Sequence, residues 1–414
     1  MAISRRTALI LAAAGAAQAC MPIPGGPGAG APDALGPEFR PQANADYDAW
    51  VAAFRTRALD AGITADSFAR GFEGQGFLPG VIERDRNQTE FRRTTEDYLA
   101  LVASDEDVSL GRSRTAPVRG TLADIEAATG VSGDVLAAIW GVETRFGTRL
   151  GQIPVISATS TLAWEGRRGR FFEAQLLAAL RIVQTRDTTP DRMTGSWAGA
   201  MGHTQLMPTV YQEYAVDFRG DGRRDIWSDD PTDGLASTAN YLVRHGWQGG
   251  RPWGFEVHLP EGFTGPTGRD NRRSVGEWRA AGVRLASGGA LPDHGPAAIH
   301  APGGARGPAW FLYRNFDVIL RYNPSTNYGI GIGYMATRLG GGGPLSRSFG
   351  PDETGLTQDQ RRELQRRLTA AGYDTGTPDG VFGRRTEAAI RDFQRARGLP
   401  VTGVASPDLL AMLR

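Results

Sequence analysis

The sequence lacks lysine, so all 46 of its basic residues are arginines, and we draw no functional conclusion from that bias. Acidic residues number 45, and the net charge of +1 gives no excess of positive charge for binding nucleic acid. Cysteine occurs only as Cys20, which excludes an intramolecular disulfide and a zinc site built from thiolates. Histidine is scarce, and its later positions have no metal-site spacing: His245, His258, His294 and His300.

Long apolar runs are confined to the N-terminus, and no later run is long enough to span a bilayer. Two arginines precede an apolar run over residues 7–17, which has about the length of a signal-peptide core. Small residues then precede Cys20, as in a bacterial lipoprotein signal with lipid attached to Cys20, although leucine is usual where Ala17 stands. Simple cleavage after Ala19 and export by a twin-arginine signal remain alternatives. We therefore expect an exported, periplasmic protein, with the lipid as its outer-membrane anchor.

Changes in composition along the chain indicate several parts. With 414 residues and 40% hydrophobic content, the chain is long enough for at least two domains with their own cores. We expect a mainly α (α+β) protein with a small β-rich insertion and a three-helix C-terminal domain. The expected parts are a signal peptide (1–20), a flexible tether (21–44), a main domain (45–340) with its insertion at about 248–314, a linker (341–355) and the C-terminal domain (356–414).

Hydrophobic periodicity predicts most of the secondary structure. Helices are expected from residue 45 and from about residue 208, over 315–339 on both sides of YNPS, and over 65–72, 89–102, 122–129, 132–147, 171–184, 232–245, 358–371, 384–397 and 406–413. Strands are expected over 255–259, 297–300 and 310–313.

The segment 132–147, SGDVLAAIWGVETRFG, contains the best candidate for a catalytic acid. Its apolar spacing places Glu143 beside an apolar face in the last turn of a helix that Gly147 could cap. Apolar surroundings and the negative end of the helix dipole both raise the pKa of a carboxyl group, which suits a general acid near neutral pH. From this segment alone, a glutamate that simply points into water is the simpler interpretation.

Three further segments combine small, amide and aromatic residues. In 195–214, GSWAGAMGHTQLMPTVYQEY, small residues lie beside Ser196 and Gln205, either as a tight packing site or as the floor of a groove for a bulky ligand. Segments 238–247 and 321–328 carry tyrosine and asparagine near apolar partners, a mixture typical of ligand sites and common where sugars bind. Taken singly, each tyrosine could equally be a half-buried core residue.

Taken together, IWGVETRFG, SWAGAMGHTQLMPT and RYNPSTNY resemble the motifs of the bacterial membrane-bound lytic murein transglycosylase B family, over roughly residues 46–339. DRNQ at 85–88 and GRR at 166–168 extend the resemblance. The C-terminal module resembles peptidoglycan-binding domain 1 through its paired helices and DGVFG motif. The resemblance implies a lysozyme-like catalytic domain that acts on the glycan strands of peptidoglycan. It does not indicate any protein partner.

The resemblance also implies roles for individual residues. It makes Glu143 the single catalytic acid and base, with Arg167 and Arg168 near the peptide or sugar. The groove would be lined by Ser196, Gln205, Tyr241, Asn323 and Tyr328. His203-Thr204 stands where Tyr-Gly is common in the family, and Pro324 where His is common. We expect these departures to affect substrate contacts rather than the reaction.

The implied reaction needs one carboxyl group, whereas ordinary glycosidases use two. Glu143 would protonate the glycosidic oxygen between N-acetylmuramic acid and N-acetylglucosamine, and would then take the proton of the C6 hydroxyl, which attacks C1 and closes a 1,6-anhydro ring without water. Two alternatives remain open. A lysozyme-type hydrolase would need a second carboxylate in the cleft, such as Asp217 or Glu165, and a non-catalytic wall-binding scaffold would tolerate the loss of Glu143.

The segment DFRGDGRRD at 217–225, with Asp233 beyond it, resembles a calcium loop seen in the family. Arg219 stands where an oxygen ligand is expected, and a polar turn closed by Asp–Arg pairs explains the segment at least as well. We therefore assign no metal and no cofactor. Glu165 and Glu173, which flank the two groove arginines, are expected to be exposed helix charges.

Overall fold

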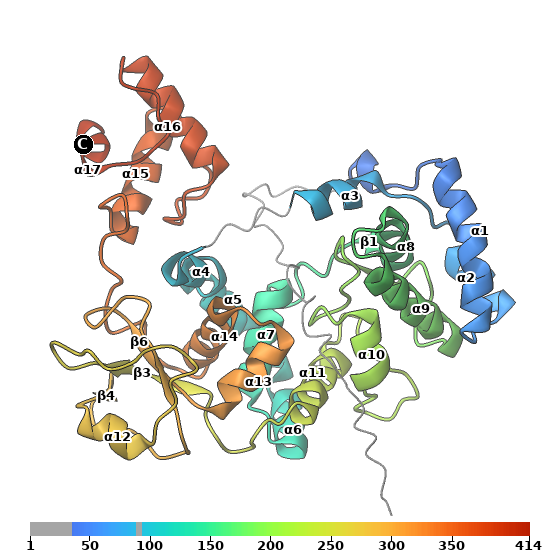
Figure 1. The fold of residues 1–414 in the computed structure, drawn as a ribbon, viewed down its shortest axis with the longest axis horizontal. Coiled ribbons are helices and arrows are strands. Elements are labelled where there is room, and N and C mark those ends of the chain that lie inside the picture. Colours follow the sequence, from blue (N-terminus) through green and yellow to red (C-terminus); the bar gives the residue numbers. More distant parts are fainter. Residues whose placement is uncertain (1–34, 88–92) are drawn as a thin grey trace, which may run out of the picture.

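The computed structural model of the protein describes residues 35–87 and 93–414. The expected signal peptide, Cys20 and residues 21–34 of the expected tether lie outside the described residues. Helices predominate in the described ranges, together with one four-stranded sheet and one short two-stranded ladder (Figure 1). The predicted mainly α class with a small β-rich part is therefore confirmed.

Two groups of helices form the main body, and apolar clusters hold each group together. One group lies on the right of Figure 1 and consists of α1 (Ala45–Asp60), α2 (Ala65–Phe72), α3 (Pro79–Arg86), α8 (Val155–Glu165), α9 (Gly169–Thr185) and α10 (Pro208–Tyr214). The other lies in the centre and consists of α4 (Thr95–Val102), α5 (Asp105–Thr115), α6 (Arg119–Thr129), α7 (Gly133–Thr144), α11 (Thr232–Arg244), α13 (Arg314–Tyr322) and α14 (Thr326–Leu339).

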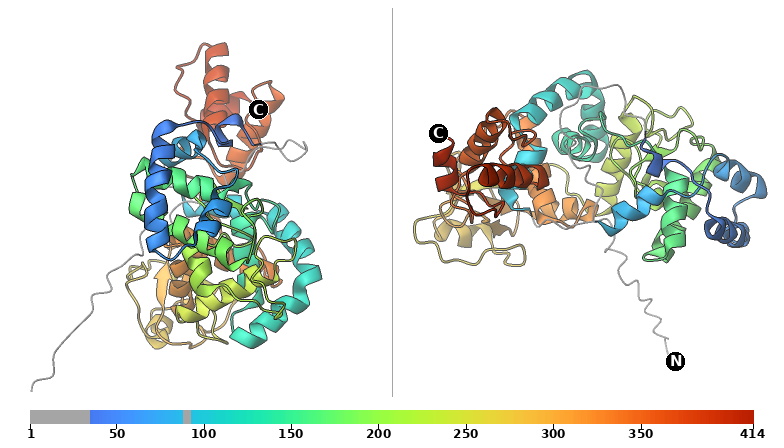
Figure 2. Two further views of the ribbon diagram at one scale, coloured as in Figure 1. Left: turned by 90° about the vertical axis from the view of Figure 1, so that its right-hand side faces the viewer. Right: turned by 90° about the horizontal axis from the view of Figure 1, so that it is seen from above.

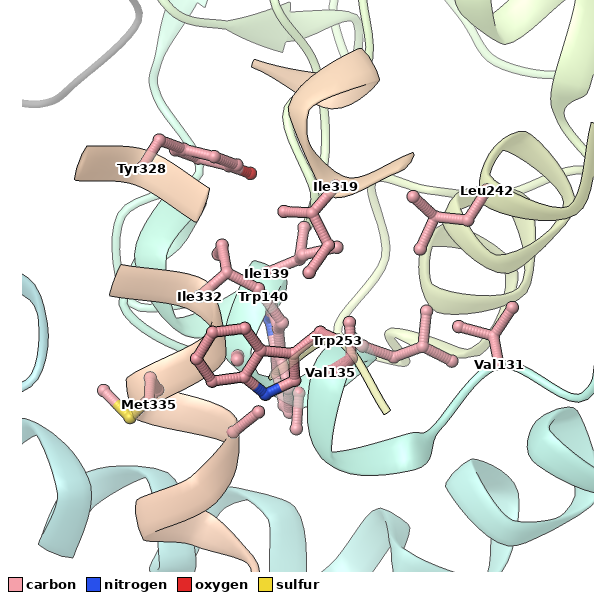
Figure 3. Close-up of a cluster of buried hydrophobic side chains, with 14 of the residues drawn as sticks. Val131, Val135, Ile139, Trp140, Leu242, Trp253, Ile319, Tyr328, Ile332 and Met335 are labelled. Carbon is pink, nitrogen blue, oxygen red and sulfur yellow. The ribbon is translucent and has the colours of Figure 1, made fainter. Parts of the chain in front are cut away.

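The centre of the second group is α7, which is buried along most of its length. Ile139 and Trp140 of α7 pack with Ile332 of α14 in one apolar cluster (Figure 3). The ring of Trp253 packs directly against α14 because Gly333 has no side chain. A Cβ at Gly333 would lie 2.4 Å from that ring. In the described ranges no single helix is long and apolar enough to cross a membrane, and α5–α6 with α7 reaches that length only as a pair bent by 118°.

Most of the predicted helices correspond to observed ones within a few residues. The helix predicted over 89–102 is shorter, since α4 begins at Thr95 and residues 88–92 lie outside the described part of the chain. Four short or buried helices had no counterpart in the predictions: α3, α5, α8 and α12 (Val275–Ala280).

The β-rich region forms one antiparallel sheet with the strand order β4-β3-β6-β5. Its strands are β3 (Gly254–His258), β4 (Arg284–Leu285), β5 (Ala298–His300) and β6 (Ala309–Leu312), which confirms the three predicted strands and adds β4. Alternation along β6 sends Trp310 and Leu312 into the cluster around α7, and Phe311 into a cluster belonging to the sheet. The sheet is thus attached to the helical core through one face of β6.

The C-terminal module consists of α15 (Gln358–Ala370), α16 (Arg384–Ala396) and α17 (Pro407–Met412) around its own apolar cluster, and forms one end of the molecule (Figure 2). Arg361 of α15 attaches it to α4. This side chain is 4% exposed and donates to Glu96 at 2.7 Å, to Asp97 at 3.0 Å and to Asp352 at 2.6 Å. Glu96 and Asp97 belong to α4, so one buried guanidinium joins the module to the helical body.

The segment 341–355, expected as a linker, lies against the sheet. Ser346 donates its backbone N–H to Glu256 of β3 at 2.9 Å, and its hydroxyl lies 2.8 Å from His258 Nε2. The ring of Phe349 packs against Trp310, with centroids 6.4 Å apart. This segment therefore also fixes the C-terminal module to the body.

Candidate active site

Glu143 is the penultimate residue of α7, in its last turn, as predicted. The helix ends there because Arg145 and Phe146 both have left-handed backbone angles, with φ of 49° and 56°. Phe146 thereby turns back into the core, where it is 1% exposed. The prediction that Gly147 caps the helix is wrong: Arg145 is the capping residue, and its backbone N–H donates to the carbonyl of Gly141 at 2.8 Å.

Tyrosines from three helices surround the carboxyl group of Glu143. Tyr328 of α14 donates its hydroxyl to Glu143 Oε1 at 2.8 Å, and the charge of Glu143 acts on the pKa of Tyr98 from α4 and Tyr322 from α13. Burial raises the pKa of Glu143 from 4.5 to about 8, and the hydrogen bond from Tyr328 opposes part of that rise. Glu143 therefore keeps its proton at neutral pH and can donate it, as predicted for a general acid.

Sequence reasoning missed Tyr98 and Tyr322. Tyr322 precedes Asn323 in the motif RYNPSTNY, so the signal was there but pointed to its neighbours. Tyr98 has no local signal, because its ring reaches the site only through the packing of α4 on Gly331 of α14, where a Cβ would lie 2.6 Å from the ring. The hydroxyl of Tyr98 is buried and has no hydrogen-bond partner in the described ranges.

Within the part of the chain that the structure describes, no second carboxylate contributes to the pKa shift of Glu143. Asp217 lies in another turn, where its oxygens accept backbone N–H groups at 2.7–3.1 Å. The expectation that Glu165 and Glu173 are exposed charges is wrong, because their side chains are only 10% and 29% exposed. Glu165 is paired with Arg86 at 3.0 Å, and Glu173 with an arginine of α1 at 2.9 Å. Neither carboxylate considered for a hydrolase is free beside Glu143.

The glycine-rich segment 195–206 is a tightly folded loop between the two-stranded ladder, β1 (Ile153–Pro154) with β2 (Thr194–Gly195), and α10. A Cβ at Gly195 would lie 2.0 Å from the carbonyl oxygen of Ala200, so the tight-packing interpretation holds there. Ser196 Oγ accepts the backbone N–H of Ala200 at 3.1 Å. Gln205 has a left-handed φ of 54° and donates its amide to the carbonyl of Leu150 at 3.1 Å. Both side chains are partly exposed, and both are held by hydrogen bonds to the backbone.

Tyr241 lies on α11 beside the tyrosines of the site. Its ring meets that of Tyr322 edge-on at 5.4 Å and stacks on His245 at 4.0 Å, while its hydroxyl donates to the carbonyl of Arg321 at 2.6 Å. Asn323, in the turn between α13 and α14, accepts the backbone N–H of Ser325 at 3.0 Å. The structure therefore brings Tyr241 to Glu143 through Tyr322, and places Asn323 at the turn that precedes Tyr328.

Arg167 and Arg168 are held by one buried carboxylate, Asp85 of α3, which is 2% exposed. Arg167 Nε donates to Asp85 Oδ2 at 2.7 Å, and Arg168 donates to Oδ1 at 2.9 Å. The ring of Phe172 lies 4.8 Å below the guanidinium of Arg168. The DRNQ and GRR motifs therefore lie together, because Asp85 of DRNQ orients both arginines of GRR.

His203 is buried, at 3% exposed, instead of facing a groove. Its Nδ1 accepts the indole N–H of Trp140 at 3.1 Å, and its carbonyl oxygen accepts the hydroxyl of Thr144 at 2.7 Å. The expectation that this departure concerns substrate contacts is therefore wrong. His203 contacts the helix that carries Glu143.

The aspartate-rich turn 217–225 is closed by backbone donors and an arginine. The two oxygens of Asp233 accept the backbone N–H groups of residues 218 and 225 at 3.0 and 2.9 Å. Arg219 donates to Asp230 at 2.6 Å and to Thr232 at 2.9 Å. Within the described ranges, no three acidic, histidine or cysteine side chains converge as a metal site. These hydrogen bonds fit a turn closed by ion pairs better than a calcium loop, because Arg219 stands at the sequence position where a calcium loop has an oxygen ligand.

Comparison with known proteins covers both modules. Residues 46–337 match the family described as Transglycosylase SLT domain, and residues 357–413 match a family of peptidoglycan binding domains. A curated relative, membrane-bound lytic murein transglycosylase B of Escherichia coli, is 35% identical over 210 residues, which are 49% of this chain and 55% of the relative. The alignment thus spans about half of that relative's length.

Two solved structures resemble most of the fold. SltB3 from Pseudomonas aeruginosa, in complex with NAG-NAM-pentapeptide, is 44% identical, with a TM-score of 0.71 over 90% of this chain and 100% of that one. The Escherichia coli lytic transglycosylase Slt35, in complex with calcium, is 27% identical, with a TM-score of 0.60 over 72% of this chain and 93% of that one. By the match over residues 46–337, this chain belongs to the Transglycosylase SLT domain family.

Proposed function

We propose that the protein is a lytic transglycosylase that cleaves the β-1,4 bond between N-acetylmuramic acid and N-acetylglucosamine in peptidoglycan and leaves 1,6-anhydro ends. The observation that carries this proposal is Glu143, a carboxyl group with a pKa of about 8 and no second carboxylate beside it in the described ranges. Family membership supports it, as does one relative, SltB3, which was solved both with NAG-NAM-pentapeptide and with NAG-anhNAM-pentapeptide.

The first half of the reaction uses Glu143 as an acid. Its proton passes to the glycosidic oxygen, the bond from C1 to that oxygen breaks, and the N-acetylglucosamine chain leaves with a hydroxyl group. The positive charge left at C1 is stabilised by the oxygen of the substrate's own acetamido group. The hydroxyl of Tyr328 stabilises the carboxylate that forms, because it already donates to Oε1 at 2.8 Å.

The second half uses the same residue as a base. The Glu143 carboxylate takes the proton of the C6 hydroxyl, and the oxygen attacks C1 and closes the anhydro ring. The proton count balances, since Glu143 ends as it began and no water is consumed. A single carboxyl group with a pKa near neutrality serves both steps, because it must give a proton and then take one back.

The sugar and peptide are held by neutral polar and aromatic side chains and by the arginine pair. Ser196, Gln205, Tyr241, Asn323 and Tyr328 are assigned to the glycan, and Arg167 with Arg168 to the lactyl-peptide or the sugar. Asp85 supports the assignment of the two arginines. It orients both guanidinium groups, but its single negative charge cannot neutralise both of their positive charges. No metal or cofactor enters the proposal.

The proposed activity gives each part of the chain a role. Residues 45–340 form the catalytic domain, 341–355 connect it, and 356–414 bind the cell wall and raise the local concentration of substrate. The protein acts in the periplasm, held at the outer membrane by a lipid on Cys20 and the tether 21–44. Fractionation of cells that express wild-type protein or Cys20→Ser tests the anchor: the wild type should be found with membranes and the variant in the soluble periplasmic fraction.

The reaction is tested by mass spectrometry of the products released from purified murein sacculi. The assay compares wild type, Glu143→Gln and a matched control, Glu83→Gln, which removes an exposed carboxylate of α3. Anhydro-muropeptides from wild type and control, and none from Glu143→Gln, are expected. Reducing-end products would indicate that water is the acceptor and overturn the proposal, and undiminished binding to sacculi with no product from any of the three proteins would indicate a scaffold.

A further inference from the structure

His203 lies in the loop 195–206, and both of its ring nitrogens form hydrogen bonds. Nδ1 lies 3.1 Å from the indole nitrogen of Trp140, and Nε2 lies 2.8 Å from the carbonyl oxygen of Ser228. An indole N–H can only donate and a carbonyl oxygen can only accept. Nδ1 must therefore present a lone pair, and Nε2 must carry the hydrogen. The ring is thus neutral and fixed in one tautomer.

His203 contacts residues of α7 that lie before and after Glu143 in the sequence. Trp140 precedes Glu143 by three residues, and Thr144, which follows it, donates its hydroxyl to the His203 carbonyl at 2.7 Å. Beyond the helix end, a Cβ on Gly147 would lie only 3.0 Å from His203 Nδ1. His203 therefore contacts the last turn of α7 on both sides of the acid.

This turn needs external support. Arg145 and Phe146 are consecutive non-glycine residues in the left-handed region, which costs free energy and persists only where surrounding packing enforces it. His203 is one of the side chains that provide that packing, through Trp140. Loss of the bond to Trp140 would leave the indole N–H without its acceptor in a buried site.

We infer that His203 is a positioning residue for Glu143, and that protonation of His203 at acid pH disconnects Trp140, displaces the last turn of α7 and sets the acid limb of the activity profile. This inference rests on the proposed catalytic role of Glu143. A proton on Nδ1 would place two N–H donors against each other at a distance where one donor and one acceptor now meet. His203 would thus control the rate without touching the substrate.

The charged groups around His203 agree with a neutral ring at neutral pH. Asp225, Asp229 and Asp230, on the turn that supplies Ser228, favour the protonated ring, but burial has the larger effect and lowers the pKa of His203 below 6.5. On α11, Gly234 packs against the His203 Cβ, and its neighbour Asp233 is already bonded to two backbone N–H groups. On α7, Asp134 lies in the first turn at the opposite end of the helix, and the titratable residue of the last turn is Glu143 itself, which is protonated in the acid range.

The test is the pH dependence of kcat and KM on soluble, uncross-linked peptidoglycan strands, followed as anhydro product. Wild type is expected to lose kcat as the pH falls through the titration of His203, which burial places below the ordinary histidine range of pKa. His203→Asn retains an oxygen that can accept from Trp140 but does not titrate, so it should keep its kcat to lower pH. His203→Ala should lower kcat about 10- to 100-fold at every pH with little change in KM, the size of effect expected from a misplaced catalytic group.

The matched control is His300→Asn on β5, which removes a half-buried histidine with a pKa lowered to about 4. The ring of His300 lies against Trp310 of β6, and its Nε2 has no hydrogen-bond partner in the described ranges, so the substitution breaks no bond to α7. An acid limb that is unchanged in His203→Asn, or that moves equally in His300→Asn, would overturn the inference while leaving Glu143 in its role. Absence of anhydro product from wild type would instead overturn the proposed function.

A second measurement uses a chain with His203 intact and does not depend on how the His203 variants fold. The indole N–H resonance of Trp140, assigned with Trp140→Phe, should shift as the pH falls through the His203 titration. A resonance that stays constant while kcat falls would contradict the inference. The same titration in Glu143→Gln should show the shift unchanged, because the bond to Trp140 does not require the acid.

Discussion

Replacement of Glu143, the proposed catalytic acid, should stabilise the protein, and the gain should grow with pH. In the folded state the pKa of Glu143 is raised by burial from 4.5 to about 8. The stabilisation from its bound proton is complete below pH 4.5, is lost progressively as the pH rises through about 8, and is constant above that. Glu143→Gln has no such proton to lose, so its stability should not decline over this window.

The magnitude follows from the two pKa values. From 4.5 to about 8, at about 1.4 kcal/mol per pH unit, the full linkage is about 5 kcal/mol. Glu143 keeps partial access to solvent, so we take about half, roughly 2–3 kcal/mol at pH 9 and well under 1 kcal/mol at pH 5. For a domain of this size that corresponds to a rise in Tm of roughly 5 °C at pH 9.

Thermal unfolding of wild type and Glu143→Gln at several values between pH 5 and 9 measures the difference. Glu83→Gln is the control, since it removes an exposed carboxylate whose loss should change Tm equally little at each pH. A Tm difference between Glu143→Gln and wild type that is absent at pH 9, or equally large at pH 5, would refute the reasoning.

Three further predictions concern other parts of the molecule. Tyr328→Phe removes the hydroxyl that lowers the pKa of Glu143, so the alkaline limb of kcat/KM should move up by about one pH unit while kcat falls. Addition of calcium or of a chelator should leave the Tm of wild type unchanged, whereas Arg219→Ser, which supplies an oxygen ligand, should be stabilised by calcium. Arg361→Ala leaves three carboxylates without their buried partner and should cost about 3–5 kcal/mol, seen in calorimetry as earlier unfolding of the C-terminal module.

Helices with one apolar face could be predicted from the sequence, and helices buried all round could not. The periodicity of residues 384–397 predicted α16 to within a residue. In α8, residues 155–163 are all buried, so no polar face marks the helix, and its hydroxyl groups bond either to the preceding turn or to other buried segments. Ser160, for example, donates to the carbonyl of Ile156 at 2.6 Å.

The site was predictable where a motif carried it and not where packing assembled it. The prediction of Glu143 in a last turn with a raised pKa depended on local spacing and is confirmed. Tyr98 comes from a helix that is distant in sequence and approaches through a glycine of α14, which no local pattern reveals. His203 departs from the family motif, but only its burial and its bond to Trp140 show which part of the molecule it contacts.

The attachment of Arg361 to α4 makes the spacing between the two modules a constant of the fold. A stiff glycan strand that occupied both modules would meet Glu143 at a set number of sugars from its contact with the wall-binding module. Such a molecule would cut in register with its own point of attachment, and its products would share a preferred length. A module on a freely swinging connection would give products of all lengths. Chain-length analysis of the released strands therefore tests whether Arg361, in the C-terminal module, fixes the distance to Glu143.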